Sequence, residues 1–224
     1  MPSIAIMQPY FVPYAGYFRL FAEADLFVIY DCVQFPRRGF VHRNRLPDAE
    51  GRARWLTLPL APAPRSARIA DMAFAPDAAE RFAARLRKFP VLSELPRKWS
   101  GLFDALEGPL VPWLEKTLAL CCTDLGIACP TVRSSSLGIS ARLKGQDRII
   151  EICQTLDATA YVNAPGGRHL YQEEVFRDHG IELRFLPPFN GSHLSVLSEL
   201  LTAGPDAVRQ EIARDGQGTE ESRA

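Results

Sequence analysis

Short apolar runs alternate with longer segments of helical periodicity along most of this chain. The apolar runs predict buried strands at residues 3–8, 26–30, 131–133, 159–162 and 181–186, and a further run, WLTLPL at 55–60, reads as an edge or ending strand because of Pro59. Apolar residues three or four apart predict helices at residues 16–24, 76–88, 93–106, 109–125, 147–156, 171–179 and 194–203. Strands separated by helices of this length favour an α/β fold, with a mainly parallel sheet flanked by helices in three layers.

The order of these elements predicts one Rossmann-like domain over residues 1–204, with a helical insert at about 76–126. A chain of 224 residues is long enough for one such domain and its insert. Residues 205–224 end in the polar stretch DGQGTEESRA, and we expect a disordered tail there.

Composition narrows the class of protein. The 26 basic and 26 acidic residues cancel, so no global charge favours nucleic acid or an anionic membrane as a partner. No apolar stretch reaches the roughly 20 residues of a membrane span, and the N-terminus lacks the features of a signal peptide. Five cysteines without paired spacing indicate a reduced, cytoplasmic protein, and no cysteine or histidine set predicts a metal site.

Polar and aromatic side chains gather in the loops that follow the predicted strands. Ligands of open parallel sheets bind beyond the carboxyl ends of the strands, so we expect these loops to meet around one pocket. The candidate binding residues are Gln8, Tyr10, Tyr17, Gln34, Arg43, Asn44, Arg45, Ser135, Gly166, Gly167 and Tyr171. Asn190, Ser192 and His193 follow the last strand and are further polar neighbours.

Each candidate has a structural reading beside its functional one. The aromatic loop QPYFVPYAGYF, residues 8–18, forms either core packing or the wall of a ligand crevice. Asp31 either caps a turn or acts as a general base or orienter, and His42 is a second group able to move a proton. Arg43 and Arg45 suit phosphate or carboxylate, or else pair with surface acids, and they share one face if this segment is a strand.

The remaining candidates carry weaker signals. Gly166 and Gly167 lie between a strand and a helix, where backbone amides approach anions, but glycine pairs also form simple turns. Ser135 either holds a hydroxylated ligand or caps the next turn. Cys32 is the one cysteine beside the expected crevice, where a thiolate nucleophile is conceivable with His42 or His193.

Six stretches of the chain resemble the WbqC-like protein family, whose bacterial members are often found among cell-surface polysaccharide genes. They are QPYFVPYAGYF (8–18), ADLFVIYDCVQFPRRGFVHRNRL (24–46), WLTLPL (55–60), RSSSL (133–137), ICQTLDATAYVNAPGGRHLY (152–171) and FRDHGIELRF (176–185). The resemblance covers most of residues 4–203. The family commonly has a second acidic residue where Cys32 stands here, so no carboxylate pair is carried over to this chain.

The resemblance implies a role in making surface glycans or a related specialised metabolite. Our hypothesis is transfer of an acyl or aminoacyl group to a sugar or amino-sugar intermediate. The expected partner is a small-molecule substrate, either a nucleotide-activated sugar or a carrier-bound acyl donor, and no cofactor is identified. Aromatic rings would stack on a sugar or base, Arg43 and Arg45 would bind phosphate, and Asp31 or His42 would move a proton.

Two other functions remain open. Strand, then F-x-P-x-x-G-Y, then helix is similar to the phosphate-binding loop of cytidylyltransferase-like nucleotidyltransferases, and the serines around Ser135 resemble their later motif. This loop, however, is one residue short and has tyrosines where that superfamily has histidines, and a neutral Tyr17 does not replace an imidazolium. The third hypothesis is a non-catalytic protein that binds partners in glycan assembly.

Overall fold

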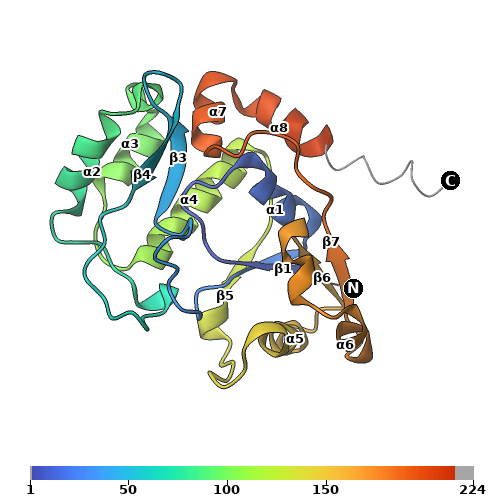
Figure 1. Cartoon of the computed structure of the whole chain (residues 1–224). Helices are drawn as coiled ribbons and strands as arrows, with labels where there is room; N and C mark the ends of the chain where they lie inside the picture. The colour runs from blue at the N-terminus through green and yellow to red at the C-terminus, as the bar shows by residue number, and fades with distance from the viewer. Residues whose placement is uncertain (1, 215–224) are drawn as a thin grey trace.

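The computed structural model describes residues 2–214 and contains a five-stranded parallel sheet (Figure 1). In spatial order the strands are β5 (Thr131–Arg133), β2 (Leu26–Ile29), β1 (Ser3–Met7), β6 (Ala160–Asn163) and β7 (Glu182–Phe185). All four neighbouring pairs run parallel. The predicted α/β fold is therefore confirmed.

Both faces of the three central strands of the sheet are buried, and strand β1 shows why. Side chains alternate across a strand, so Ile4 and Ile6 pack on one face and Ala5 packs on the other. The first face is covered by α5 (Gly145–Thr155) and α6 (Glu173–Asp178), and the second by α1 (Arg19–Glu23) and α4 (Leu110–Asp124). Apolar side chains on both faces are what a parallel sheet between helical layers requires.

The order of the strands creates a crevice at the carboxyl end of β1. Numbered along the chain within the sheet, the strands lie in the order 3-2-1-4-5. From β1 the chain moves outward through β2 to β5, and then returns past β1 to β6 and β7. The connections after β1 and β6 therefore leave in opposite directions. Such a switch point is where open α/β sheets bind their ligands.

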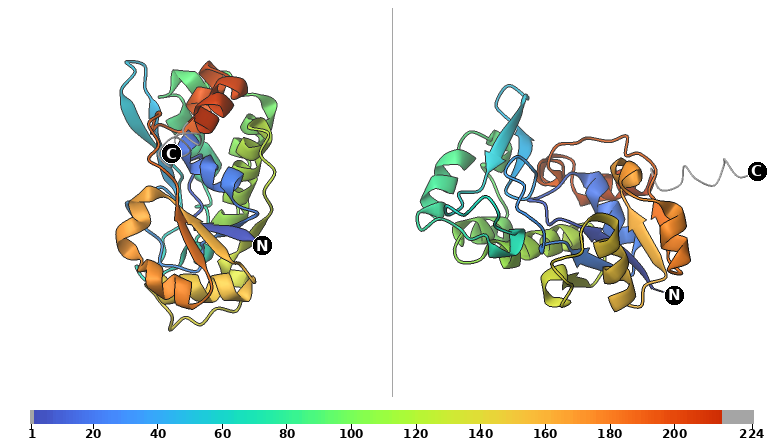
Figure 2. Two further views of the ribbon diagram at one scale, coloured as in Figure 1. Left: turned by 90° about the vertical axis from the view of Figure 1, so that its right-hand side faces the viewer. Right: turned by 60° about the horizontal axis from the view of Figure 1, so that its bottom comes forward.

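A long segment between β2 and β5 forms a subdomain beside the sheet. It contains the antiparallel hairpin of β3 (Arg43–Pro47) and β4 (Ala53–Thr57), then α2 (Ala78–Leu86), α3 (Arg97–Asp104) and α4, with short turns η2 (Ile69–Asp71) and η3 (Pro90–Leu92). Both views of Figure 2 show the hairpin, in light blue, projecting from the body of the molecule. The WLTLPL run thus overlaps β4 and pairs with β3, outside the main sheet.

Aromatic rings hold this subdomain against the first loop. The ring of Phe11 lies 6.1 Å from that of Phe82 and 5.9 Å from that of Trp113, measured between centroids. Phe82 and Phe103 meet edge-on at 5.3 Å. Since Phe11 is fully buried, part of the aromatic loop is core, as one of the two readings of the sequence expects.

The C-terminal region corrects one prediction. Residues 205–224 were expected to be a disordered polar tail, but residues 205–214 form helix α8 (Pro205–Arg214), which follows α7 (Val196–Thr202). Val208 and Ile212, four residues apart on one face of the helix, are buried in the main core. The stretch DGQGTEESRA lies outside the described residues. Among residues 2–214 there is no helix whose length and apolar character would allow it to span a bilayer.

Candidate functional site

A cavity of about 490 Å³ opens at the switch point, where the carboxyl ends of β1 and β6 lie side by side. Gln8 and Tyr10 reach it from the loop after β1, and Asn163 reaches it from the end of β6. The turn η5 (Pro165–Leu170) adds Gly166 and Gly167, and Tyr171 follows that turn. The structure therefore brings together two of the segments that the sequence places after separate strands, residues 8–17 and 163–171. The volume is typical of a small-molecule site.

Tyrosine dominates the wall of this cavity. The chain has six tyrosines, and all of them line it: Tyr10, Tyr14, Tyr17, Tyr30, Tyr161 and Tyr171. Gln8 and Asn163 add side-chain amides, and the rest of the lining is apolar or glycine. No lysine, arginine, histidine, aspartate or glutamate of residues 2–214 contributes to the wall. This cavity, which we call the tyrosine cavity, therefore offers aromatic faces and neutral hydrogen-bonding groups.

The tyrosine hydroxyls stay protonated at neutral pH. Burial raises the pKa of Tyr10, Tyr17 and Tyr161 above its ordinary value, and it raises the pKa of Tyr30 to about 12 despite the opposing charge of Arg148. Each of these four hydroxyls is therefore a neutral group that both donates and accepts hydrogen bonds.

Some of these hydroxyls are already engaged, and others are not. Tyr17 donates to the backbone carbonyl of Gln8 at 2.8 Å, and the hydroxyls of Tyr161 and Tyr171 lie 3.4 Å apart. The hydroxyls of Tyr10 and Tyr14 make no hydrogen bond to any residue between 2 and 214, and neither does the side-chain amide of Gln8. These three groups are consequently available to a ligand.

A strained residue shapes the aromatic loop. Val12 has a φ of 34°, which is unfavourable for a β-branched side chain, and it is fully buried. Two donors hold its carbonyl: the Asn44 side-chain amide at 2.7 Å and the Ser195 hydroxyl at 2.6 Å. Asn44 also donates to the Phe11 carbonyl at 3.0 Å. Asn44 therefore supports the loop through its buried amide, and it also lines a smaller neighbouring cavity together with Arg45.

Gly16 allows close packing in the same loop. A Cβ atom at this position would lie 2.5 Å from the Phe189 ring and 2.5 Å from the Tyr14 ring, closer than such atoms approach in proteins. Gly16 lies in the short helix η1 (Ala15–Phe18) and lines the tyrosine cavity. The absence of a side chain at Gly16 therefore allows two aromatic rings to pack against it. In a phosphate-binding loop, by contrast, a glycine at this place would lie beside an anion.

Asp31 lies outside the tyrosine cavity. Its carboxylate accepts hydrogen bonds from the Ser134 hydroxyl at 3.1 Å, the Ser135 amide at 2.9 Å and the Ser135 hydroxyl at 2.7 Å. The side chain is 1% exposed. These bonds tie the end of β2 to η4 (Ser134–Ser136), which follows β5. Neither Asp31 nor Ser135 lines the tyrosine cavity, and their contacts are those of the capping interpretation.

His42 and Gln34 also lie outside the tyrosine cavity. The His42 ring packs 5.0 Å from the ring of Phe35, and its Nδ1 atom is buried without a hydrogen-bond partner. Burial, together with the charges of Arg43 and Arg85, lowers the pKa of His42 to about 4, so the ring is neutral at pH 7. Gln34 donates to the Arg65 carbonyl at 2.7 Å on the exposed surface.

Arg43 and Arg45 share the outer face of β3, as strand alternation requires, with Asn44 buried between them. The Arg43 guanidinium donates to the carbonyls of Arg38 at 2.6 Å and Gly39 at 3.3 Å, and lies 4.1 Å above the Trp55 ring. Arg45 instead lines a smaller cavity of about 180 Å³ with Tyr10, Tyr14 and His193, which we call the side cavity. Tyr10 and Tyr14 line both cavities.

Cys32, the cysteine considered as a nucleophile, is half-buried, and its sulfur lies beside one guanidinium. A guanidinium nitrogen of Arg148 lies 3.9 Å from the Cys32 sulfur. Cys32 does not line the tyrosine cavity or the side cavity.

Sequence reasoning missed four polar residues of the wall: Tyr14, Tyr30, Tyr161 and Asn163. The sequence did contain a signal for three of them. Tyr30 directly follows strand β2, Asn163 ends strand β6, and Tyr14 belongs to the aromatic loop. Tyr161 lies inside the apolar run of β6, where a tyrosine is expected to be part of the hydrophobic core. Its ring does pack in the core, 5.9 Å from that of Phe176, while its hydroxyl lies near that of Tyr171.

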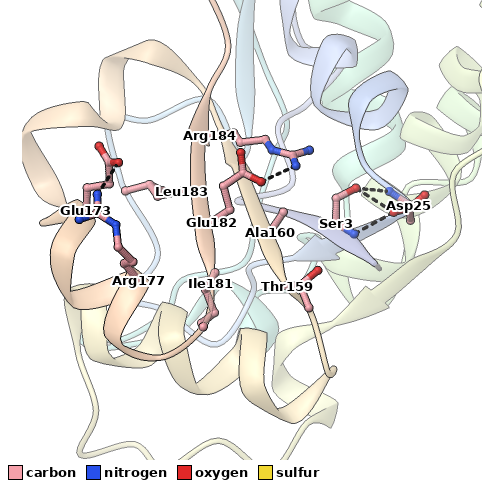
Figure 3. A pocket seen from close by; sticks show the side chains of 11 residues that line it. Ser3, Asp25, Thr159, Ala160, Glu173, Arg177, Ile181, Glu182, Leu183 and Arg184 are labelled. Carbon is pink, nitrogen blue, oxygen red and sulfur yellow. Dashed lines mark hydrogen bonds and ion pairs between the residues drawn. The ribbon is translucent and has the colours of Figure 1, made fainter.

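A larger hollow, of about 790 Å³, lies at the opposite end of the sheet (Figure 3). It is lined by the first residues of β1, β6 and β7 and by one side of α6. Its charged groups pair with each other: Arg177 with Glu173 at 3.1 Å, and Arg184 with Glu182. Asp25 accepts from the Ser3 amide at 2.8 Å. Since these groups are satisfied and face the amino ends of the strands, the tyrosine cavity is the better candidate site.

Comparison with known proteins gives a family and an uncharacterised relative. The sequence model of the WbqC-like protein family matches residues 8–209, well over half of the chain. A protein of Mycobacterium tuberculosis (strain ATCC 25618 / H37Rv), named uncharacterized protein Rv1507c, is 28% identical over 194 residues, which cover 82% of this chain and 81% of that protein. No solved structure matches the chain. The matched region contains every residue of the tyrosine cavity except Ile6 and Met7, and the chain belongs to the WbqC-like protein family.

Proposed function

We propose that this protein is an enzyme of surface-glycan or specialised-metabolite synthesis, which transfers an acyl or aminoacyl group to a sugar or amino sugar. The observation that carries the proposal is the wall of the tyrosine cavity. It combines six phenol rings with two amide side chains, and no charged side chain from the described part of the chain, residues 2–214, belongs to it. That combination is suited to an uncharged, hydroxyl-rich ring.

The chemistry of sugar recognition matches these groups. The C–H faces of a pyranose pack on aromatic rings, while its hydroxyls need both donors and acceptors. The unengaged hydroxyls of Tyr10 and Tyr14 and the amide of Gln8 supply both functions. Charged side chains would add affinity for ions but are not required for a neutral sugar ring.

An uncharged cavity also supports acyl transfer to an amino sugar. Removal from water disfavours an ammonium ion, so the bound amine is held in its nucleophilic, neutral form. Its nitrogen attacks the carbonyl carbon of a thioester donor, the carbon–sulfur bond breaks with its electron pair on sulfur, and the amine proton passes to the departing thiolate. The products are an amide and a thiol. The role of the protein is to align the reactants and to donate a tyrosine hydrogen bond to the carbonyl oxygen.

The proposal is tested by titrating the whole protein with uncharged sugars, amino sugars and nucleotide-activated sugars, and following its melting temperature. We expect stabilisation by at least one of them, and release of free thiol with formation of an amide when an acyl thioester is added. Tyr10→Phe and Tyr14→Phe should each weaken binding about three- to tenfold, because each removes one neutral hydrogen bond. Ser136→Ala removes an exposed hydroxyl outside the cavity and should leave binding unchanged.

The outcomes separate this proposal from its alternatives. Failure of every sugar and activated sugar to stabilise the protein contradicts it. Binding without amide formation from any thioester favours the non-catalytic role in glycan assembly. Release of pyrophosphate from a nucleoside triphosphate favours a nucleotidyltransferase, whose candidacy gains from the 3-2-1-4-5 strand order but lacks cationic residues in the tyrosine cavity.

A further inference from the structure

The side cavity joins the tyrosine cavity through two shared residues. Tyr10 and Tyr14 stand between the two hollows and contribute to the lining of both. The side cavity is the smaller, at about 180 Å³, and is closed by Phe40, Pro13 and the outer face of β3. A ligand that fills the tyrosine cavity therefore lies against two rings that also border a second compartment.

This second compartment, unlike the first, is cationic. Arg45 lines it from β3 and His193 lines it from the loop before α7. The His193 ring packs 4.9 Å from the ring of Tyr14, one of the two residues that line both cavities. Neither an aspartate nor a glutamate of residues 2–214 belongs to the lining.

The Arg45 guanidinium has hydrogen-bonding capacity that the protein does not use. Its Nε atom is buried and has no partner, and its side chain makes no ion pair with any residue from 2 to 214. The ring of Trp55 lies 5.8 Å from it. A buried N–H without a partner is costly, and a guanidinium has five such donors to satisfy.

Other charged side chains of the hairpin already have partners within the protein. Asp48 pairs with Arg52 at 3.4 Å and with Arg54 at 3.3 Å, at the tip of the hairpin. Arg43, two residues away on the same face, is held by two backbone carbonyls. Arg45 is therefore the arginine of β3 whose charge is open to an external anion.

We propose that the side cavity binds the phosphoryl group of an activated substrate whose uncharged ring occupies the tyrosine cavity. This inference rests on the proposed function and specifies its ligand as a conjugate of a neutral ring and a phosphate or diphosphate. The planar fork of Arg45 matches two phosphate oxygens, and His193 is a second donor on the same side. A nucleotide-linked sugar and the phosphopantetheine arm of an acyl carrier share this chemistry.

The test is calorimetric titration of the full chain with four probes: UDP-N-acetylglucosamine, UDP, coenzyme A and N-acetylglucosamine. Arg45→Gln should weaken binding of the phosphorylated probe by roughly ten- to hundredfold, the range for a hydrogen bond to a charged group. Binding of N-acetylglucosamine should stay unchanged, because it has no phosphate. Arg45→Lys keeps the charge without the fork and should give an intermediate loss.

Arg52→Gln is the matched control, because it removes one positive charge from the tip of the same hairpin, where Arg52 is exposed and paired with Asp48 and Glu50. It should leave every affinity within about twofold. Circular dichroism of each variant establishes that it is folded.

The two sources of phosphate give different results. A loss confined to UDP-N-acetylglucosamine and UDP identifies a nucleotide-linked sugar, and a loss confined to coenzyme A identifies the acyl carrier. Unchanged binding of all phosphorylated probes by folded Arg45→Gln overturns the subsite, as does wild-type protein that binds none of them. In both of those cases, sugar binding that is weakened by Tyr10→Phe leaves the proposed function standing, whereas absence of all binding overturns both.

Discussion

At Gly167 the backbone passes within touching distance of Asn163, the residue that ends β6. A Cβ atom at Gly167 would lie 2.5 Å from the Asn163 side-chain nitrogen, whereas a Cβ atom at the adjacent Gly166 would meet nothing within 4 Å. Both glycines line the tyrosine cavity, and neither has a positive φ. The two glycines thus differ in the space available beside each α-carbon.

Gly167→Ala is therefore expected to displace Asn163 and to lower the stability of the protein by about 1–3 kcal/mol, the usual cost of overpacking. Sugar binding should weaken with it, because Asn163 forms part of the wall. Gly166→Ala should change neither quantity by a measurable amount. Urea denaturation and ligand titration of the two variants check this, and equal behaviour of the two would contradict it.

His42 makes the stability of the protein depend on pH. Its pKa is about 4 in the folded protein, against an ordinary value of 6.5 that applies to the unfolded chain. Between pH 6.5 and 4 the unfolded chain binds a proton that the folded protein does not, so this histidine makes stability fall as pH is lowered through that window. His42→Gln should flatten the slope of unfolding free energy between pH 7 and pH 5.

The control for this experiment is His179→Gln, since His179 is exposed at the end of α6. It should retain the pH slope of the natural protein. A His42→Gln protein whose unfolding free energy keeps the same pH slope as the natural one would show that another group is responsible.

At single residues the sequence was least able to separate structural from functional roles. Asp31 and Asn44 are polar side chains near strand ends, as a binding site requires, but the partners that occupy them lie far away. Ser134 is 103 residues from Asp31 in sequence, and Val12 is 32 residues from Asn44. A pattern of residue types does not indicate which hydrogen bonds such distant groups will make. In the structure Asn44 donates to backbone carbonyls, and Asp31 accepts from two serines.

At the scale of elements, the aromatic loop depends on its two neighbours, β3 and α7. The Val12 carbonyl accepts from Asn44 on β3 and from Ser195, the residue that precedes α7 and whose hydroxyl also accepts from the Leu197 amide. The strained φ of Val12 is thus maintained from two sides. The shape of the wall formed by Tyr10 and Tyr14 follows from this arrangement.

Asn44→Ala and Ser195→Ala should each cost about 1–3 kcal/mol, because each removes a buried donor. Their effects should not add, since both donors act on one carbonyl, and the double variant should differ from the sum by about 0.5 kcal/mol or more. Chemical denaturation of the four proteins in this cycle gives the coupling. Strict additivity would mean that Val12 is held by something else.

Elements with a strong apolar pattern were predicted well, and those with a weak one were not. The strand expected at residues 26–30 is β2 (Leu26–Ile29), because both of its faces are buried and its run is continuous. β3 was only a conditional possibility, since its outer face carries Arg43 and Arg45 and its inner face includes a polar residue, Asn44. A strand outside the main sheet, polar on one side, leaves little for a pattern to detect.

At the scale of the whole molecule, α8 closes the core from the C-terminal side. Only Val208 and Ile212 of this helix are buried, which explains why its sequence was read as a tail. Ile212→Ala should lower the free energy of unfolding by about 2 kcal/mol. Gln210→Ala, on the exposed side of the same helix, should change it by less than about 0.5 kcal/mol. A neutral Ile212→Ala would mean that α8 adds nothing to the core.

The sheet and its crevice followed from the alternation of strands and helices, but the strand order did not. Helical connections imply parallel neighbours, and parallel neighbours imply that polar loops collect at the carboxyl ends. Which strands become neighbours is decided by three-dimensional packing. For this reason the loops after β1 and β6 meet at the tyrosine cavity, while Asp31 and Ser135, after β2 and β5, form a separate cluster.

Because every phenol ring of the chain borders the tyrosine cavity, an isotope label placed on tyrosine reports on that cavity without any mutagenesis. Carbon-13 incorporated only at the ζ carbon of tyrosine would yield six resonances, one from each ring, and each ring borders the same cavity. Binding of any molecule in the tyrosine cavity, natural or synthetic, would then change the chemical shifts of these carbons. The spectrum would contain no signals from labelled carbons elsewhere in the chain.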